Sequence, residues 1–84
     1  MSLQPFQRVA LRADFPQHGL RSGDVATLID RVPHPTDQSK PDGCVLEVFN
    51  ALGDSIAVIT VPETSVQPLR ADEVLAIRTL AKAG

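Results

Sequence analysis

The sequence contains no tryptophan and no tyrosine, and only three phenylalanines occur among its 84 residues. Domains that hold proline-rich peptides do so in grooves lined by aromatic rings, and single-stranded nucleic acids stack their bases on such rings. The shortage of aromatic side chains therefore argues against both kinds of binding site.

Positive charge is not in excess either. Eight Lys and Arg residues face ten Asp and Glu residues, which gives a formal net charge of −2 and a pI near 5.5. A domain that grips nucleic acid by its phosphates normally concentrates Lys and Arg and is basic overall. Nucleic acid is thus not the partner that this charge predicts.

Cysteine and long apolar runs are also scarce. Cys44 is the single cysteine, so no intramolecular disulfide is possible, and no run approaches the roughly 18 apolar residues of a membrane-spanning helix. The first residues lack the basic and apolar regions of a signal peptide. We therefore expect a cytoplasmic protein without a membrane segment, folded as a single domain over residues 1–84.

The sequence does contain a series of short segments typical of β-strands. Residues 25–32 form an apolar, β-branched run between turn signals, which predicts a strand buried on both faces. Residues 50–54 form a five-residue connector containing glycine, which predicts a hairpin between its two flanking strands. Five strands are expected, at residues 7–13, 25–32, 44–49, 55–61 and 66–70.

Two other segments have different characters. Residues 33–43 carry three prolines and no large apolar side chain, which predicts a flexible, solvated loop. Residues 72–82 begin with Asp72, a good helix N-cap, and place Val74, Ile77 and Leu80 at helical spacing. A short C-terminal α-helix is therefore expected there.

These elements predict an all-β domain, a small five-stranded SH3-like barrel over residues 6–70 with the C-terminal helix appended. The competing five-stranded barrel, the OB-fold, places a helix between its third and fourth strands. Here that position holds only residues 50–54, so the SH3-like order is favoured.

Several short motifs follow one another in a set order: residues 8–11, 18–20, 23–29, 46–48, Gly53 and residues 66–70. In this order they resemble the domain of unknown function 4926 family of small, uncharacterised bacterial proteins. The resemblance covers residues 6–70, and it implies an SH3-like barrel of unknown activity. This chain departs from the family in having Ala26 where a second glycine often follows Gly-Asp-Val, and in its longer proline-rich loop and added helix.

The turn at residues 18–24 is the first place to look for a site. His18 lies beside Gly19 in a loop, where an imidazole could act as an acid, a base or a ligand, but no nucleophile or carboxylate shares a catalytic spacing with it. We interpret His18 as a structural residue that hydrogen-bonds the backbone. Gly19 and Gly23 supply backbone freedom in this turn.

Two carboxylates complete the candidate residues. Asp24 is expected to accept hydrogen bonds from turn N–H groups. Glu47 is expected on the solvent side of its strand, or paired with Arg8 or Arg12 across the sheet. No catalytic or cofactor-binding residue is predicted, and no cofactor is expected.

A metal site would have to combine residues that are far apart in the sequence. None of them form the short-range pairs of structural zinc sites, so no metal site is predicted. The candidates are His18, Asp24, His34, Asp42 and Cys44.

The favoured hypothesis is a non-enzymatic bacterial protein-interaction module with a protein partner, of a regulatory, antitoxin-like or immunity-like kind. One alternative is a binder of RNA or ribosomal components similar to KOW modules, using Arg8, Arg12, Arg21 and Arg31. Another is an accessory SH3-like subunit of an enzyme complex. A homodimer contact through the C-terminal helix is a further hypothesis.

Overall fold

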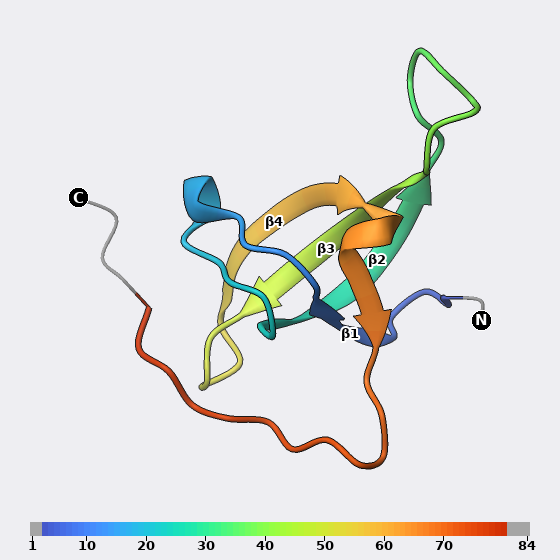
Figure 1. Ribbon diagram of the computed structural model, residues 1–84. Coiled ribbons are helices and arrows are strands. Elements are labelled where there is room, and N and C mark those ends of the chain that lie inside the picture. The colour runs from blue at the N-terminus through green and yellow to red at the C-terminus, as the bar shows by residue number, and fades with distance from the viewer. Residues whose placement is uncertain (1–2, 81–84) are drawn as a thin grey trace.

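Alternating apolar and polar residues are arranged in one antiparallel sheet in a computed structural model, which describes residues 3–80 (Figure 1). The strand order is β4-β3-β2-β1-β5. Two single-turn 3₁₀ helices, η1 (Pro16–His18) and η2 (Glu63–Ser65), lie in the connections. The strands are β1 (Arg8–Leu11), β2 (Val25–Val32), β3 (Gly43–Phe49), β4 (Ser55–Pro62) and β5 (Val66–Pro68).

One face of the sheet carries the core. Leu46 on β3 lies opposite Leu28 on β2 and Ile59 on β4, and all three are almost fully buried. Along β2, however, buried and half-exposed residues alternate, and Val32 at its end is exposed. The prediction that this strand is buried on both faces is wrong, because an open antiparallel sheet covers only one of its faces here.

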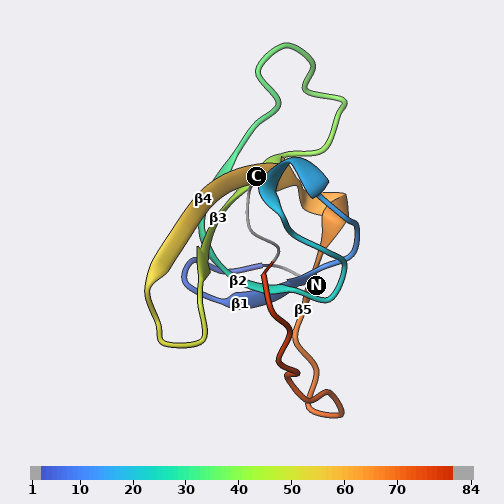
Figure 2. The same cartoon turned by 90° about the vertical axis from the view of Figure 1, so that its left-hand side faces the viewer.

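The strand and hairpin predictions are otherwise confirmed. The connector at residues 50–54 joins β3 to β4, and its Asn50 side-chain oxygen accepts the N–H groups of Leu52 and Asp54 at 3.0 and 2.9 Å. Gly53 has a φ of 88°, a value that side chains disfavour. The loop between β2 and β3 projects away from the sheet (Figure 2).

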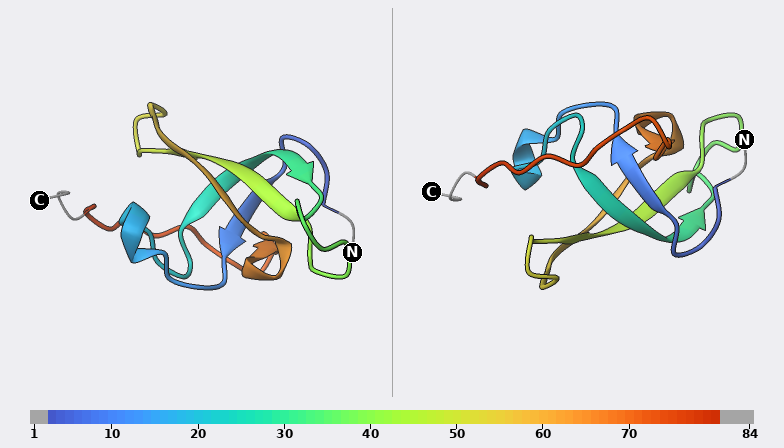
Figure 3. Two further views of the ribbon diagram at one scale, coloured as in Figure 1. Left: turned by 90° about the horizontal axis from the view of Figure 1, so that it is seen from above. Right: turned by 90° about the horizontal axis from the view of Figure 1, so that it is seen from below.

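The prediction of a closed barrel is wrong. The sheet is curled, with one extra residue in β2 at Ile29 and one in β4 at Ile56, but its edge strands β4 and β5 do not pair (Figure 3). Closure requires the two edges to exchange hydrogen bonds along a shared ladder. β5 is only three residues long and includes Pro68, which has no N–H to donate, so it offers little for such a ladder.

The predicted C-terminal α-helix is also absent, and the sheet is followed instead by an extended segment. Residues 72–80 are not helical, and residues 81–82 of the expected helix lie outside the described residues. The exposed fractions of Val74 and Ile77 are 92% and 94%, so these two side chains of the expected stripe are almost uncovered by residues 3–80. An isolated helix of this length is marginal without such packing.

Polar groups at the start of this segment take other partners. Glu73 accepts the Arg70 N–H through its side chain at 2.6 Å, and Asp72 forms an ion pair with Arg70 at 2.7 Å. These contacts form a turn instead of a helix N-cap. Among residues 3–80, no helix is long and apolar enough to cross a membrane.

The single thiol offers a probe of this core. Cys44 is fully buried on β3, and burial raises its thiol pKa above the ordinary value. Because the thiolate is the reactive form, a disulfide reagent at about pH 8 is expected to react at least about 100-fold more slowly with the folded protein than with denatured protein. A Ser39→Cys variant, which adds an exposed thiol, should show one fast and one slow reaction. Equally fast reaction of both thiols would contradict the buried position of Cys44.

Candidate functional site

The turn between β1 and β2 is held by backbone groups. Phe15 and Leu20 bridge across η1, where the Phe15 N–H donates to the Leu20 carbonyl at 2.9 Å. Leu20 is buried and Phe15 packs against the core. Gly19 and Gly23 have φ values of 69° and 95°, so both need the backbone freedom of glycine. The result is a rigid platform at one end of the sheet.

Asp24 is the polar centre of this platform. Its carboxylate accepts the Arg21 N–H at 2.8 Å, which is the turn-holding role expected from the sequence. It also accepts two bonds from the guanidinium of Arg78, through Nε at 2.8 Å and through an Nη group. A third bond from Arg78 goes to the Gly19 carbonyl at 3.1 Å. Arg78 therefore anchors the chain end to the turn by three hydrogen bonds.

This anchor, the ion pair between Asp24 and Arg78, is largely shielded from water. The side chains of Arg78 and Asp24 are only 24% and 19% exposed. The hydrogen bonds from Arg78, opposed by burial and supported by the Arg21 N–H, lower the pKa of Asp24 below its ordinary value of 3.8. The hydrogen bond to Asp24 in turn raises the pKa of Arg78 above its ordinary value. Asp24 is accordingly ionised at neutral pH and holds the guanidinium as a bidentate ion pair.

The anchor positions what we call the C-terminal segment, residues 71–80. This segment crosses below the sheet in an extended conformation and ends beside the turn (Figure 1). A groove of about 1080 Å³ lies between it and the sheet, with Ala26, Val48 and Ile56 among the apolar residues on the sheet side. The C-terminal segment contributes Val74, Leu75, Ile77 and Leu80.

Of the other residues singled out in the sequence, His18 and Glu47 are not brought to the anchor. His18 is exposed, and its side chain makes no hydrogen bond with residues 3–80, so the turn is held without its imidazole. Glu47 is half-buried on β3 and accepts a hydrogen bond from the Ser55 hydroxyl at 2.7 Å. It forms no ion pair with Arg8 or Arg12 within the described part of the chain.

The residues considered for a metal lie apart. His34 accepts the Asp37 N–H at 3.1 Å within the loop between β2 and β3, while Cys44 faces the core. Across residues 3–80, no group of three or more His, Cys, Asp or Glu side chains is arranged to hold a metal ion. These residues therefore serve as separate local contacts.

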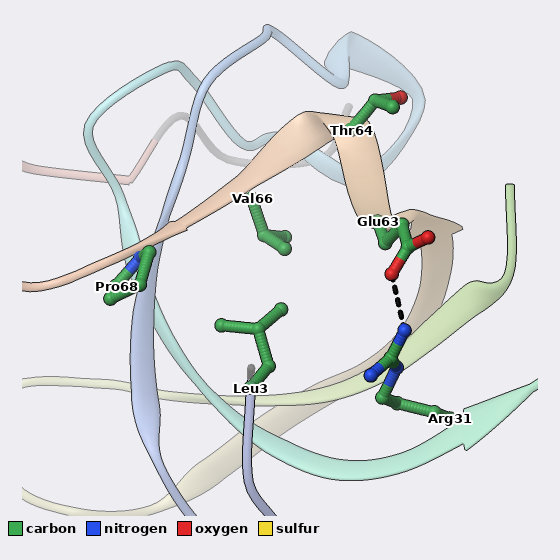
Figure 4. Close-up of a pocket in the computed structure, with 6 residues that line it drawn as sticks. All are labelled: Leu3, Arg31, Glu63, Thr64, Val66 and Pro68. Carbon is green, nitrogen blue, oxygen red and sulfur yellow. Dashed lines mark hydrogen bonds and ion pairs between the residues drawn. The ribbon is translucent and has the colours of Figure 1, made fainter. Parts of the chain in front are cut away.

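A second, smaller pocket lies at the other end of the sheet. Its volume is about 260 Å³, and Leu3, Val66 and Pro68 form its apolar side (Figure 4). Arg31 and Glu63 form an ion pair at its rim, and Asp42 lies 3.5 Å from the same guanidinium. Because two carboxylates already neutralise Arg31, this pocket has no unpaired charge from Arg31 to offer an anion.

Arg78 is the site residue that sequence reasoning missed. In the sequence it is one polar residue within an apolar helical pattern, 54 positions from Asp24. No local pattern connects the two residues. Only the extended path of residues 71–80 across the sheet brings them together.

Comparison of the chain with family models, with curated proteins and with solved structures finds no match. The resemblance to the domain of unknown function 4926 family therefore stays a prediction. The geometry defines an open, five-stranded all-β domain whose apolar C-terminal segment is hydrogen-bonded to the β1–β2 turn.

Proposed function

We propose that this chain is a non-enzymatic protein-interaction module that binds a protein partner through the C-terminal segment and the groove beside it. The observation that carries this proposal is the exposure of aliphatic side chains in that segment. Val74, Leu75 and Ile77 are 92%, 58% and 94% exposed. Three large aliphatic side chains exposed within residues 74–77 are typical of a surface that another protein covers.

The chemistry of the segment indicates the kind of partner surface. Its exposed large side chains are all aliphatic. Its charged residues already have partners, since Asp72 pairs with Arg70, Glu73 accepts the Arg70 N–H, and Arg78 pairs with Asp24. An aliphatic segment is recognised by an apolar cleft, because burying a Val or Ile side chain contributes about 1.5–3 kcal/mol. We therefore propose a partner protein with an aliphatic cleft, with polar contacts in a minor role.

The anchor at Arg78 supports the same proposal. Binding by a free chain end costs conformational entropy for every residue that becomes ordered. Here the three hydrogen bonds of Arg78 hold one end of the segment, while Leu69 and Arg70 connect the other end to β5. The segment is thus presented to a partner in an ordered, extended form, which reduces that entropic cost.

The form of this function that we propose is regulatory, of the antitoxin or immunity type. A small domain that presents an apolar segment can inactivate an enzyme by covering a cleft on its surface. The mild net negative charge of −2 is compatible with such a protein partner. The C-terminal segment and the groove would then carry the function, and the function would involve no reacting group.

The test uses the full chain in two stages. A photoreactive amino acid at position 77 is expected to give one discrete protein adduct in the native host, whose protein component is then purified. Binding of that protein to a Val74→Ser, Ile77→Ser double variant should be about 100-fold weaker than to the natural sequence, from about 3 kcal/mol of lost burial. Calorimetry measures the two dissociation constants.

Leu52→Ser is the matched control, since Leu52 is 88% exposed in the β3–β4 connector and does not line the groove. Its affinity for the partner should be unchanged. Equal affinity of the double variant and the natural sequence would refute the proposal. An adduct that disappears on nuclease treatment would favour the RNA-binding alternative. An adduct with a large enzyme subunit in a one-to-one ratio would favour the accessory-subunit alternative.

A further inference from the structure

The second feature without a partner is the free edge of β4. This strand pairs with β3 on one side, and within residues 3–80 no other backbone group hydrogen-bonds to residues 55–62 on the other side. An edge strand exposes a row of unpaired N–H and C=O groups, which can pair with a further strand. We propose that the β4 edge pairs with β4 of a second copy of this chain, forming a symmetric antiparallel dimer.

The composition of β4 supports a partner strand. Proteins usually protect a free edge with charged side chains, a bulge or an inward-pointing charge. The eight residues Ser55–Pro62 include no charged side chain, Pro62 stands only at the last position, and the one bulge, at Ile56, lies near the start of the strand. Val58 on its outer face is 58% exposed. The regular, uncharged part of this edge, residues 57–61, favours strand addition.

Self-pairing in particular is favoured by the pattern of side chains. In an antiparallel pair related by a two-fold axis at Val58, the two copies of Val58 lie directly opposite each other. Thr60 of one copy then lies on the same side of the sheet, beside the bulge at Ile56 of the other copy. Cross-strand pairs of β-branched residues stabilise a sheet, whereas like charges placed opposite each other destabilise it. Because residues 55–62 carry no charge, no like charges lie opposite each other within the paired strands.

The nearest charge on the same face is compatible with the dimer. Glu47 lies opposite Val58 on β3, on the side away from the free edge. In the dimer, the two copies of Glu47 are separated by three strand spacings, about 14 Å. That distance exceeds the screening length of about 8–10 Å at ordinary salt concentrations. Glu47 is also hydrogen-bonded to Ser55, which holds its carboxylate within its own copy.

The size of the contact predicts its strength. Pairing along one strand buries less than the standard protein interface and belongs with weak, transient contacts. We therefore expect a dissociation constant in the range of about 10 µM to about 1 mM. Sedimentation of the natural sequence should show a shift from monomer to dimer across that range.

The decisive variants place charge at the two-fold axis. Val58→Lys is expected to weaken dimerisation at least about tenfold, because the two introduced ammonium groups lie opposite each other. Val58→Glu should do the same. An equal mixture of the two variants should form a one-to-one heterodimer, since the opposite charges then face each other. Val32→Lys, which charges an exposed valine at the end of β2 away from this edge, is the control and should dimerise normally.

Several results would overturn the proposal. These are a natural sequence that stays monomeric up to about 1 mM, a Val58→Lys variant that dimerises as well as the control, or a mixture of the charged variants that stays monomeric. Circular dichroism of each variant separates a loss of pairing from a loss of folding, which is not expected because Val58 is exposed. None of these variants touches the C-terminal segment, so the outcome is independent of the proposed partner binding.

Discussion

Replacing Leu46 by alanine is expected to lower the free energy of unfolding by about 3 kcal/mol, the middle of the range for a buried leucine. Leu46 has no exposed surface and stands on the central strand β3, opposite Leu28 and Ile59. The removed methyl groups leave a cavity between three strands whose hydrogen bonds prevent collapse. For a domain of this size, the change corresponds to a fall in melting temperature of about 15 °C.

Chemical denaturation of the Leu46→Ala variant measures this change, with circular dichroism as the signal. The control is Leu52→Ala, which removes the same atoms from an 88% exposed side chain and should change the stability by less than about 0.5 kcal/mol. A loss below about 1 kcal/mol for Leu46→Ala would show that the centre of the sheet is not packed as described.

Replacing Asp24 by asparagine is expected to release the C-terminal segment and to lower the free energy of unfolding by about 1–2 kcal/mol at neutral pH. The carboxylate accepts bonds from the Arg21 N–H and from two guanidinium nitrogens. An amide has one acceptor oxygen, and its NH₂ group would face donors. Trypsin cleavage after Arg78 should therefore be faster in the variant than in the natural sequence.

The pH dependence of this effect has a definite sign. The folded state lowers the pKa of Asp24 from 3.8, chiefly through its hydrogen bonds from Arg78. A carboxyl group whose pKa is lower in the folded state contributes stability above its unfolded pKa and loses it as pH falls through the folded pKa. The difference in stability between the natural sequence and Asp24→Asn should be largest above about pH 5 and should shrink in acid.

The control for this prediction is Asp72→Asn, which breaks the exposed ion pair with Arg70. The two side chains there are 64% and 68% exposed, and surface pairs contribute little. Its stability should stay within about 0.5 kcal/mol of the natural sequence at every pH. If Asp24→Asn showed the same small change, with no faster cleavage after Arg78, the anchor would be unimportant for the position of the segment.

The parts of the fold that local pattern determines could be predicted. β2 occupies residues 25–32, as the β-branched run between two turn signals indicates. The β3–β4 hairpin follows from two apolar strands around a connector whose Gly53 adopts a positive φ. In each case, neighbouring residues carry the signal.

The parts that depend on distant pairs could not be predicted. Whether β4 and β5 close a barrel depends on hydrogen bonds between the two edges, which no local pattern encodes. Helical spacing in residues 72–82 is equally misleading, because spacing reports which side chains could share a face and says nothing about a surface to cover them. The Asp24–Arg78 pair depends on the extended path of that segment. The sequence therefore indicated Asp24 as a candidate residue but did not indicate Arg78, its main partner.

The difference between the two edges of the sheet limits how large an assembly can grow. β5 has three residues and includes Pro68, whereas β4 has eight residues and no charge. A molecule with two receptive edges could add copies at both ends and extend into a fibre. With only β4 receptive, the first pairing uses up the receptive edge of both copies, and the process stops at a closed pair. Pro68 on β5 therefore prevents further copies from adding at that edge of the sheet.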